Sequence, residues 1–486
     1  MQKVFDNPSE LEALAKQKYG IPDFIMMENA ALAIKNLLLQ LKSSSPTLTN
    51  TIPDCIILCG KGNNGGDGYA LARLISDMLN PLVFCLEPPT ASEAKTQYEM
   101  CKKLGITFLS KTALTKALNN TKNPPAFIID CLYGTGFKGN LTAETAEIVA
   151  LANKAKSIRI ACDIPTALTF NADYTVTMGE QKLQLFSDKA KSVCGKIIVA
   201  PLGINKDIFE ATTSPAAFLI ETNDIKLPFR TNKASHKGTY GHTAVFAGEK
   251  SGAAIISATA AMNFGSGLTT IIKQEKSNLT QFKISPELMI SETIPAKTTC
   301  IVLGPGSDTL QPQTAAAIET WWFNTKTKSP AAVFDAGMFG NKDFILLLKK
   351  LCARKDSRIV LTPHLAEFVR FNSLFTVEEM ANSPESKIKA GMALLKKFPG
   401  ITLVIKSANT FIFNKKQTYI ITDGAPSLAK GGSGDVLAGM IASLLAQGYS
   451  TIDAAITACE THALARTKHG EQAWDLSPMR LIKMMS

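Results

Sequence analysis

Short apolar runs that end in glycine or aspartate alternate with helical stretches along the whole chain, and this alternation constrains the fold most. The runs of the first half are residues 56–59, 82–86, 127–130, 158–163 and 196–201. Those of the second half include residues 243–247, 300–303, 331–335, 359–361 and 403–406. Strands joined by helices in this way form βαβ units around a parallel sheet. We therefore expect an α/β fold.

The chain is too long for one hydrophobic core, because its 486 residues exceed the size at which a single core keeps growing. Residues 205–237 lack the strand–helix periodicity, so the junction between domains is expected there. We expect one domain over residues 1–210 and another over residues 211–486. The motifs of the two halves differ, which favours two different α/β domains over a duplicated one.

Two helices are expected at the start of the chain. The first has Asn7 as its cap, Pro8 at its first position and Glu10 closing a capping box, and it ends at Gly20. The second spans residues 22–42 and carries an apolar stripe along one face.

Composition argues against several classes of protein. No run approaches the ~18 apolar residues of a membrane span, and the N-terminus lacks the apolar stretch of a secretory signal. We therefore expect a soluble, cytoplasmic protein without a membrane partner. The ten cysteines are scattered singly, as in proteins with reduced thiols. The net charge of +11 comes from dispersed lysines, which favours small anionic ligands and no nucleic acid.

A glycine-rich segment follows the apolar run at residues 56–59. It reads Gly-Lys-Gly-Asn-Asn-Gly-Gly-Asp-Gly over residues 60–68 and leads into a helix. Glycines at such a place let backbone N–H groups approach a phosphate at the helix N-terminus. A tight structural turn is the alternative, but Asn63, Asn64 and Asp67 add polar side chains that a turn does not need.

Two aspartates close further strands of the first half. Asp130 precedes a second glycine-containing segment, and Asp163 precedes Pro165 and Thr166. Open α/β sheets bind ligands at the carboxyl ends of their strands, so three polar strand ends predict one site. The alternative for each aspartate is a helix or turn cap.

Five motifs of the first half point to one family. They are Met26-Met27-Glu28-Asn29-Ala30, the segment 63–67, Asp130 with Gly134, Gly136 and Gly139, Asp163-Ile164-Pro165-Thr166, and Ala172-Asp173 with the run after it. Together they resemble the NAD(P)H-hydrate epimerase domain, along essentially its whole length. The resemblance implies a Rossmann-like three-layer α/β/α fold and a potassium ion held by Asn64, Asp130 and Thr166.

The same resemblance implies the substrate contacts of an epimerase. They are Asn63, Asn64, Gly65, Gly66, Asp67, Gly134, Thr135, Gly136, Phe137, Lys138, Gly139, Asn140 and Asp163. Since Asp130 is assigned to the cation, Asp163 is expected to be the catalytic general acid/base. The family usually has Ser-Gly where this chain has Thr166-Ala167.

The segment 429–439 of the second half, Ala-Lys-Gly-Gly-Ser-Gly-Asp-Val-Leu-Ala-Gly, opens an apolar helix. Glycines before a helix provide backbone donors for an anion. Asp435 is expected on the first turn, where it can take the proton of a hydroxyl that attacks phosphorus. Lys406 to Thr410 follow one strand and suit a nucleotide. His364 and Glu367 follow another and suit substrate contact, with a satisfied polar turn as the alternative.

With Pro286-Glu287-Leu288-Met289 and Gly304-Pro305-Gly306, these motifs resemble the nucleotide-dependent NAD(P)H-hydrate dehydratase, a ribokinase-like α/β domain. The resemblance runs from about His236 to the C-terminus. It implies substrate contacts from Ala253, Gly306, His364 and the catalytic Asp435. It implies nucleotide contacts from Lys406, Ser407, Ala408, Asn409, Thr410 and Gly434. The chain departs from the family pattern at Asp308, Gly337, Ser407 and Asn409.

The two halves together resemble the bifunctional NAD(P)H-hydrate repair family. The implied activity is epimerisation of R and S hydrated NADH and NADPH, followed by dehydration of the S epimer at the expense of ADP or ATP with Mg2+, through phosphorylation of the hydroxyl and elimination. A homo-oligomer is expected. The choices between ADP and ATP and between the two hydrates stay open.

Two other functions compete with repair. A vitamin or sugar kinase shares the Gly-x-Gly-Asp segment but leaves the first domain unexplained. A non-catalytic binding protein has no need of Asp130, Asp163 and Asp435.

Overall fold

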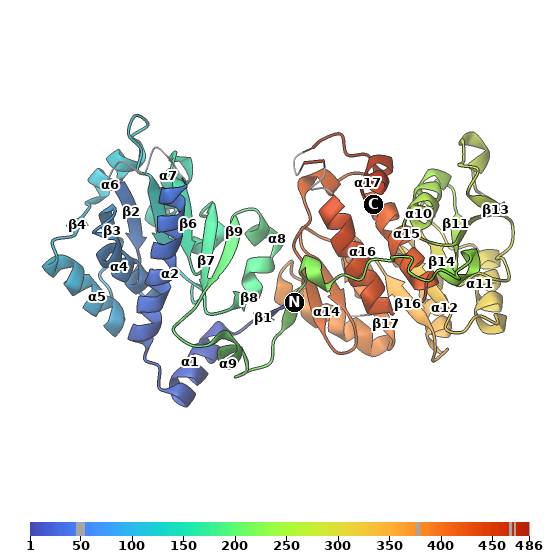
Figure 1. Cartoon of the computed structure of the whole chain (residues 1–486), viewed down its shortest axis with the longest axis horizontal. Coiled ribbons are helices and arrows are strands. Elements are labelled where there is room, and N and C mark those ends of the chain that lie inside the picture. The colour runs from blue at the N-terminus through green and yellow to red at the C-terminus, as the bar shows by residue number, and fades with distance from the viewer. Residues whose placement is uncertain (45–53, 376–379, 466–468, 471–472, 486) are drawn as a thin grey trace. The chain divides into compact units, whose positions relative to one another are not determined.

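The computed structural model (Figure 1) describes residues 1–44, 54–375, 380–465, 469–470 and 473–485. The chain divides after Ala216 into two compact parts. The N-terminal part holds residues 3–216, and the C-terminal part holds residues 217–486 with residues 1–2. The interval 205–237, in which no strand–helix periodicity was found, contains α9 (Lys206–Glu210) and β10 (Ala217–Leu219). Both are too short to show a periodic pattern.

The N-terminal part contains a parallel sheet in the order β4-β3-β2-β5-β6-β7-β9. Its strands are β2 (Asp54–Cys59), β3 (Asn80–Cys85), β4 (Thr107–Phe108), β5 (Phe127–Cys131), β6 (Ile158–Cys162), β7 (Tyr174–Met178) and β9 (Lys196–Ala200). Two short strands, β1 (Gln2–Phe5) and β8 (Gln181–Lys182), pair with each other in parallel. The expected runs at 56–59, 82–86, 127–130, 158–163 and 196–201 all fall on these strands.

Helices cover both faces of this sheet. They are α1 (Pro8–Tyr19), α2 (Asp23–Ser43), α4 (Asn63–Ile75), α5 (Ser92–Lys103), α6 (Lys111–Leu118), α7 (Ala143–Lys154) and the short α8 (Asp188–Lys191). Alternate residues of β2 enter different cores: Cys55 and Ile57 pack with α2 and α4, and Ile56 and Leu58 pack with α6 and α7. This alternation produces the three layers of the expected Rossmann-like domain.

The first two helices begin and end close to the expected residues, but one expected contact is absent. The side chain of Asn7 makes no hydrogen bond to the backbone of α1. Its Nδ2 donates instead to Oε2 of Glu10 at 3.2 Å, so the two side chains satisfy each other and the expected capping box is wrong. Gly20, at φ +69°, ends α1 as expected.

Helix α2 is long and apolar enough to cross a membrane by length and composition, the one such helix among the described residues. Seven of its side chains are buried, and they belong to the same core as β2 and α4. Packing of this kind is typical of a core helix.

The C-terminal part contains a second sheet, in the order β13-β12-β11-β14-β15-β16-β17-β18-β19-β10. Its strands are β11 (His242–Ala247), β12 (Leu268–Lys273), β13 (Met289–Ser291), β14 (Cys300–Leu303), β15 (Ala331–Phe334), β16 (Arg358–Leu361), β17 (Ile401–Ile405), β18 (Thr410–Phe413), β19 (Thr418–Ile421) and β10. The strands are parallel from β13 to β17, and β17, β18 and β19 are antiparallel neighbours. The predicted class, two different α/β domains, is confirmed.

Helices again lie on both faces. They are α10 (Ser251–Asn263), α11 (Pro312–Asn324), α12 (Lys342–Cys352), α13 (Leu365–Ser373), α14 (Pro384–Lys397), α15 (Ser433–Ala446), α16 (Thr451–Ala465) and α17 (Pro478–Met484). Helices α10, α15, α16 and α17 share one core with the valines of the central strands. Phe334 of β15, Phe344 of α12 and Phe371 of α13 pack together in another cluster.

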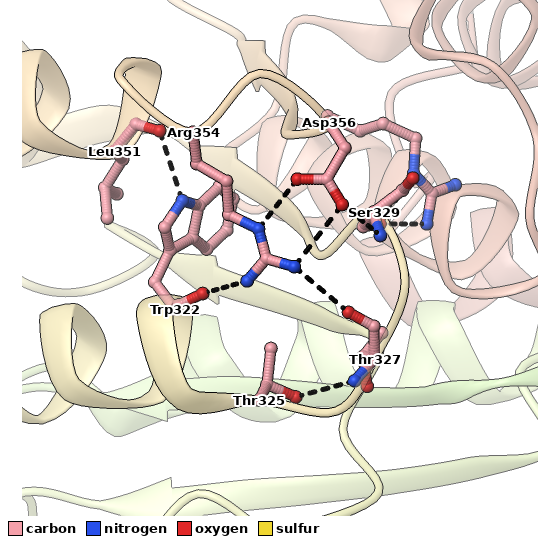
Figure 2. A network of polar contacts seen from close by, with 8 residues as sticks. Trp322, Thr325, Thr327, Ser329, Leu351, Arg354 and Asp356 are labelled. Carbon is pink, nitrogen blue, oxygen red and sulfur yellow. Dashed lines mark hydrogen bonds and ion pairs between the residues drawn. The ribbon is translucent and has the colours of Figure 1, made fainter.

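A polar network closes the loops that lead into β15 and β16, at the amino ends of these strands (Figure 2). The guanidinium of Arg354 donates to Oδ1 of Asp356 at 2.8 Å and to the carbonyl oxygens of Trp322 and Thr327. The indole of the fully buried Trp322 donates to the carbonyl of Leu351 at 3.1 Å. These contacts fix the edge of the sheet opposite the carboxyl ends.

Candidate active sites

A cavity of about 760 Å³ opens at the carboxyl edge of the N-terminal sheet. Its size suits a small-molecule ligand. Nine of the expected substrate residues line it: Asn63, Asn64, Asp67, Gly134, Thr135, Gly136, Phe137, Lys138 and Asp163. The lining does not include the other four expected contacts, Gly65, Gly66, Gly139 and Asn140.

The polar residues of the first glycine segment lie on a helix, because α4 already begins at Asn63. Its N-terminal N–H groups therefore lie beside the cavity. Gly65 serves packing, since a Cβ there would lie 1.9 Å from the carbonyl oxygen of Gly60. The segment thus packs tightly at Gly65 and begins a helix beside the cavity, and ligand binding there stays a prediction.

Asp130 and Thr166, two of the three expected potassium ligands, are in direct contact. The Thr166 hydroxyl donates to Oδ1 of Asp130 at 2.7 Å, and its backbone N–H donates to Oδ2 at 2.7 Å. Burial raises the pKa of Asp130 to about 6. The third, Asn64, has a buried amide whose oxygen and nitrogen find no hydrogen-bond partner among the described residues. A buried carboxylate and an unpartnered amide oxygen fit an oxygen-coordinated cation.

Asp163 is held on both carboxylate oxygens. Oδ2 accepts from the backbone N–H of Thr135 at 2.9 Å and from its hydroxyl at 2.7 Å, and Oδ1 pairs with Nζ of Lys182. Burial alone would raise the pKa of Asp163, but the Lys182 ammonium and the bonds from Thr135 outweigh it and lower the pKa. Asp163 also has φ +70°, a strained backbone conformation typical of functional sites.

Sequence reasoning missed Lys182, Glu180 and Glu12. Lys182 and Glu12 line the cavity, and Glu180 is fully buried beside Lys182. The available signal was the pair Glu180 and Lys182 just after the strand-like run 172–177, since buried charges next to a strand end seldom serve packing alone.

The expected residues of the C-terminal part gather at the carboxyl ends of five adjacent parallel strands, β11, β14, β15, β16 and β17. The loops after β11 and β14 meet at Gly306, which has φ +69°. A Cβ at Gly306 would lie 2.1 Å from the carbonyl oxygen of Lys250 and 3.2 Å from Cβ of Ala253. Glycine is therefore required where Gly306 and Ala253 come together.

The loops after β15 and β17 meet in an ion pair. Nζ of Lys406 lies 2.7 Å from Oδ1 of Asp335, which also accepts from the Thr362 hydroxyl at 2.9 Å. Gly434 lies against this pair, since a Cβ there would be 3.2 Å from Nζ of Lys406. Asp335 was not among the site residues expected from the sequence.

Asp435 lies on the first turn of α15, as expected. Burial is the main cause that raises its pKa to about 7, and the carboxylates of Asp335 and Glu367 add to it, while Lys406 lowers it. A carboxyl group with such a pKa is poised to exchange a proton near neutral pH.

His364 caps α13 and stays half exposed. Its Nδ1 accepts from the backbone N–H of Glu367 at 3.2 Å, and its backbone N–H donates to Oε2 of Glu367 at 2.9 Å. This is the satisfied polar turn given above as the alternative to substrate contact. Because the imidazole ring is exposed, capping α13 does not prevent His364 from contacting a substrate. Its backbone forms a bridge with that of Lys406, which joins it to the rest of the site.

The expected nucleotide segment Lys406 to Thr410 is the turn between β17 and β18. Ser407 Oγ accepts from Nζ of Lys387 at 3.0 Å and donates to the carbonyl of Asn409 at 2.7 Å. Ser407 and Asn409, which depart from the family pattern, thus take part in the internal bonding of this turn.

His462 of α16 was also missed. Its Nε2 lies 3.1 Å from both the hydroxyl and the carbonyl oxygen of Ser433, two residues before Asp435. Because a carbonyl only accepts, Nε2 carries the proton of this imidazole, and burial lowers the pKa of His462 to about 4. Nothing local in the sequence links the two positions.

Comparison with known proteins agrees with this division of sites. A family model described as YjeF-related protein N-terminus matches residues 23–183, and one described as NAD(P)H-hydrate dehydratase matches residues 243–486. The bifunctional NAD(P)H-hydrate repair enzyme Nnr of Helicobacter pylori is 35% identical, over 99% of each chain. This chain belongs to the bifunctional NAD(P)H-hydrate repair enzyme family.

Two further proteins show lower identity to this chain. The enzyme of the same name from Coxiella burnetii is 29% identical, over 95% of this chain and 93% of that one. Among solved structures, the ADP/ATP-dependent NAD(P)H-hydrate dehydratase of Bacillus subtilis, co-crystallized with ATP and Mg2+, is 24% identical with a TM-score of 0.43. That match covers 53% of this chain and 92% of the other.

Proposed function

We propose that this chain repairs hydrated NADH and NADPH in two steps. Residues 1–210 interconvert the R and S epimers of the hydrate, and residues 211–486 dehydrate the S epimer at the expense of ADP or ATP. The proposal rests on the match of this chain, over 99% of its length, to a bifunctional relative. In agreement with two activities, each part of the chain has its own site with carboxylates at strand ends.

The dehydratase reaction starts with proton removal by Asp435. As the substrate hydroxyl attacks the terminal phosphorus of the nucleotide, its proton passes to the Asp435 carboxylate and the bond from phosphorus to the nucleotide's bridging oxygen breaks. The ring nitrogen then shares its lone pair with the adjacent carbon as the C–O bond breaks and phosphate leaves. Loss of a proton from the neighbouring ring carbon restores NAD(P)H.

The surrounding residues divide the remaining tasks. Lys406 offers an ammonium group to the nucleotide phosphates, and the bare Gly434 lets the start of α15 approach them. Gly306, Ala253 and the exposed ring of His364 border the space for the hydrate. The carboxylates of Asp335 and Asp435 lie close enough for Asp335 to raise the pKa of Asp435. Together they would fit Mg2+, which would supply positive charge to the phosphates.

The epimerase reaction uses the same lone pair. As the ring nitrogen forms a C=N bond, the C–O bond breaks and the hydroxyl leaves with a proton from solvent as water. Water then adds to the opposite face, the electron pair returns to nitrogen, and Asp163 accepts the proton that water gives up. Since the pKa of Asp163 is lowered, it acts as the base at neutral pH.

Asn64, Asp130 and Thr166 fit a potassium ion. Bound K+ would supply positive charge next to the Asp130 carboxylate, which burial otherwise disfavours. The ten free cysteines, eight of them buried, fit a reducing cytoplasm. A homo-oligomer remains part of the proposal, and its test is the mass of the native protein in solution.

Two single-site variants test the proposed division. Asp435→Asn is expected to abolish dehydration while the epimers still interconvert. Asp163→Asn is expected to dehydrate the S epimer and to leave the R epimer unconverted. Chromatographic separation of the epimers reads both. Loss of both activities in either variant, or full epimerisation in Asp163→Asn, would contradict the assignment.

A further inference from the structure

Lys182 is a lysine buried in the wall of the N-terminal cavity. Its side chain is 2% exposed, and it is the second residue of the two-residue strand β8. Its Nζ pairs with Oδ1 of Asp163 and lies 3.9 Å from Oε1 of Glu180. A buried ammonium group loses the stabilisation of water and needs charged partners to remain ionised. Lys182 has such a partner in Asp163, within the site itself.

The position of the Asp163 carboxylate depends on Lys182 on one side. Thr135 occupies Oδ2 with two hydrogen bonds, at 2.9 and 2.7 Å, and Lys182 occupies Oδ1. A carboxylate offers about four acceptor positions, so these three contacts leave about one for a water or substrate proton. The Asp163 side chain is 12% exposed, and it lines the cavity.

The other ionisable groups around Asp163 are acidic. They come from α1, α4, β6 and the turn before β8, and they are Glu12, Asp67, Cys162 and Glu180. Burial raises the pKa of Glu180 to about 8 and also raises the pKa of Glu12 and Asp67, so burial disfavours negative charge on these neighbours. Lys182 is thus the positive charge that this group of residues places against Asp163.

We propose that Lys182 is a positioning residue for epimerisation, which holds the Asp163 carboxylate in one orientation and in its proton-accepting form. The inference rests on the proposed epimerase function of the N-terminal part. Lys182 touches Asp163 and not the reacting carbon, so it acts through the base.

Removing Lys182 leaves Asp163 buried among acidic groups. Burial then favours a protonated carboxyl, which cannot accept a proton from water. Oδ1 also loses its partner, so the orientation of the carboxyl group depends on the hydrogen bonds from Thr135 to Oδ2. Both effects slow the addition of water and leave the C-terminal site untouched.

The experiment compares full-length variants with the parent on purified R epimer. Lys182→Met keeps the length of the side chain without the charge, and Lys182→Arg keeps the charge. Lys196→Met, at an exposed lysine of the same part, is the matched control. We expect kcat for epimerisation to fall by about 100-fold in Lys182→Met, to recover in part in Lys182→Arg and to stay unchanged in Lys196→Met. Dehydration of the S epimer, measured on the same samples, stays unchanged in all three.

A double variant separates positioning from a merely structural role. Asp163→Asn/Lys182→Met replaces the pair by neutral groups, and its melting curve reports folding. We expect it to epimerise no more slowly than Asp163→Asn alone, because residues that act as a unit are not additive. A double variant about tenfold slower than Asp163→Asn, or Lys182→Met within about twofold of the parent, would overturn the inference. A parent chain without epimerase activity would instead refute the proposed function.

Discussion

The pH dependence of dehydration is expected to follow Asp435. Burial raises the pKa of the Asp435 carboxyl to about 7, well above that of an exposed aspartate. The deprotonated form, which acts as the base, is therefore lost as the pH falls through neutrality. The ionised fraction drops from about one half at pH 7 to about one tenth at pH 6. With saturating S epimer and nucleotide, kcat should therefore fall about fivefold over this step and about tenfold over the next pH unit.

Asp335→Asn tests the physical cause of this profile. The Asp335 carboxylate raises the pKa of Asp435 and also holds Lys406, so its removal subtracts one negative charge and frees one positive charge. The acid limb of the profile should move to lower pH. Asp435→Asn should reduce kcat by about 10²- to 10⁴-fold at every pH.

The assay is the return of the ultraviolet absorbance of NADH from purified S epimer, with epimerisation of the R epimer followed as the internal control. Stopped assays at several nucleotide concentrations separate kcat from nucleotide affinity. A kcat that stays constant from about pH 5 to pH 8, or an acid limb unmoved in Asp335→Asn, would refute the role of Asp435 as base.

Three further predictions concern stability and ion binding. Ala167→Gly should raise the free energy of unfolding of the N-terminal part by about 1 kcal/mol, because Ala167 has φ +51°; an unchanged or lower transition in calorimetry would argue against strain there. Potassium should raise the melting temperature of the parent and leave Asp130→Asn unaffected, and an equal shift in both would remove the ion from this site. Trp322→Phe should destabilise the C-terminal part by about 1 kcal/mol, since the carbonyl of Leu351 loses the indole N–H and keeps the longer bond, 3.3 Å, from the backbone N–H of Arg354; denaturant unfolding identical to the parent would show that the indole bond contributes nothing.

Elements with strong local signals were predictable from the sequence. The central strands of both sheets are apolar runs closed by polar residues, and Asp435 follows a glycine segment whose helix start is recognisable by itself. Very short strands such as β1 and β8 were not predicted, because two to four residues are too few to show a periodic pattern. The short helix α9 was not predicted for the same reason.

Contacts between distant residues were not predictable. Lys406 and Asp335 are 71 positions apart, and His462 and Ser433 are 29 apart, so only the order of the strands and helices brings them together. The contact between Lys182 and Asp163 shows the same limit. Glu180 and Lys182 form a local signal of charge after a strand, but Asp163 follows a different strand, 19 positions away.

Repair by a single chain can be measured directly on a mixture of both NADH-hydrate epimers with Mg2+ and either ADP or ATP, followed until the absorbance is constant. We expect complete recovery of NADH, and comparison of the two reactions identifies the nucleotide that supports it. Recovery that stops at the S-epimer fraction would contradict an active N-terminal site, and no recovery with either nucleotide would contradict the repair function as a whole.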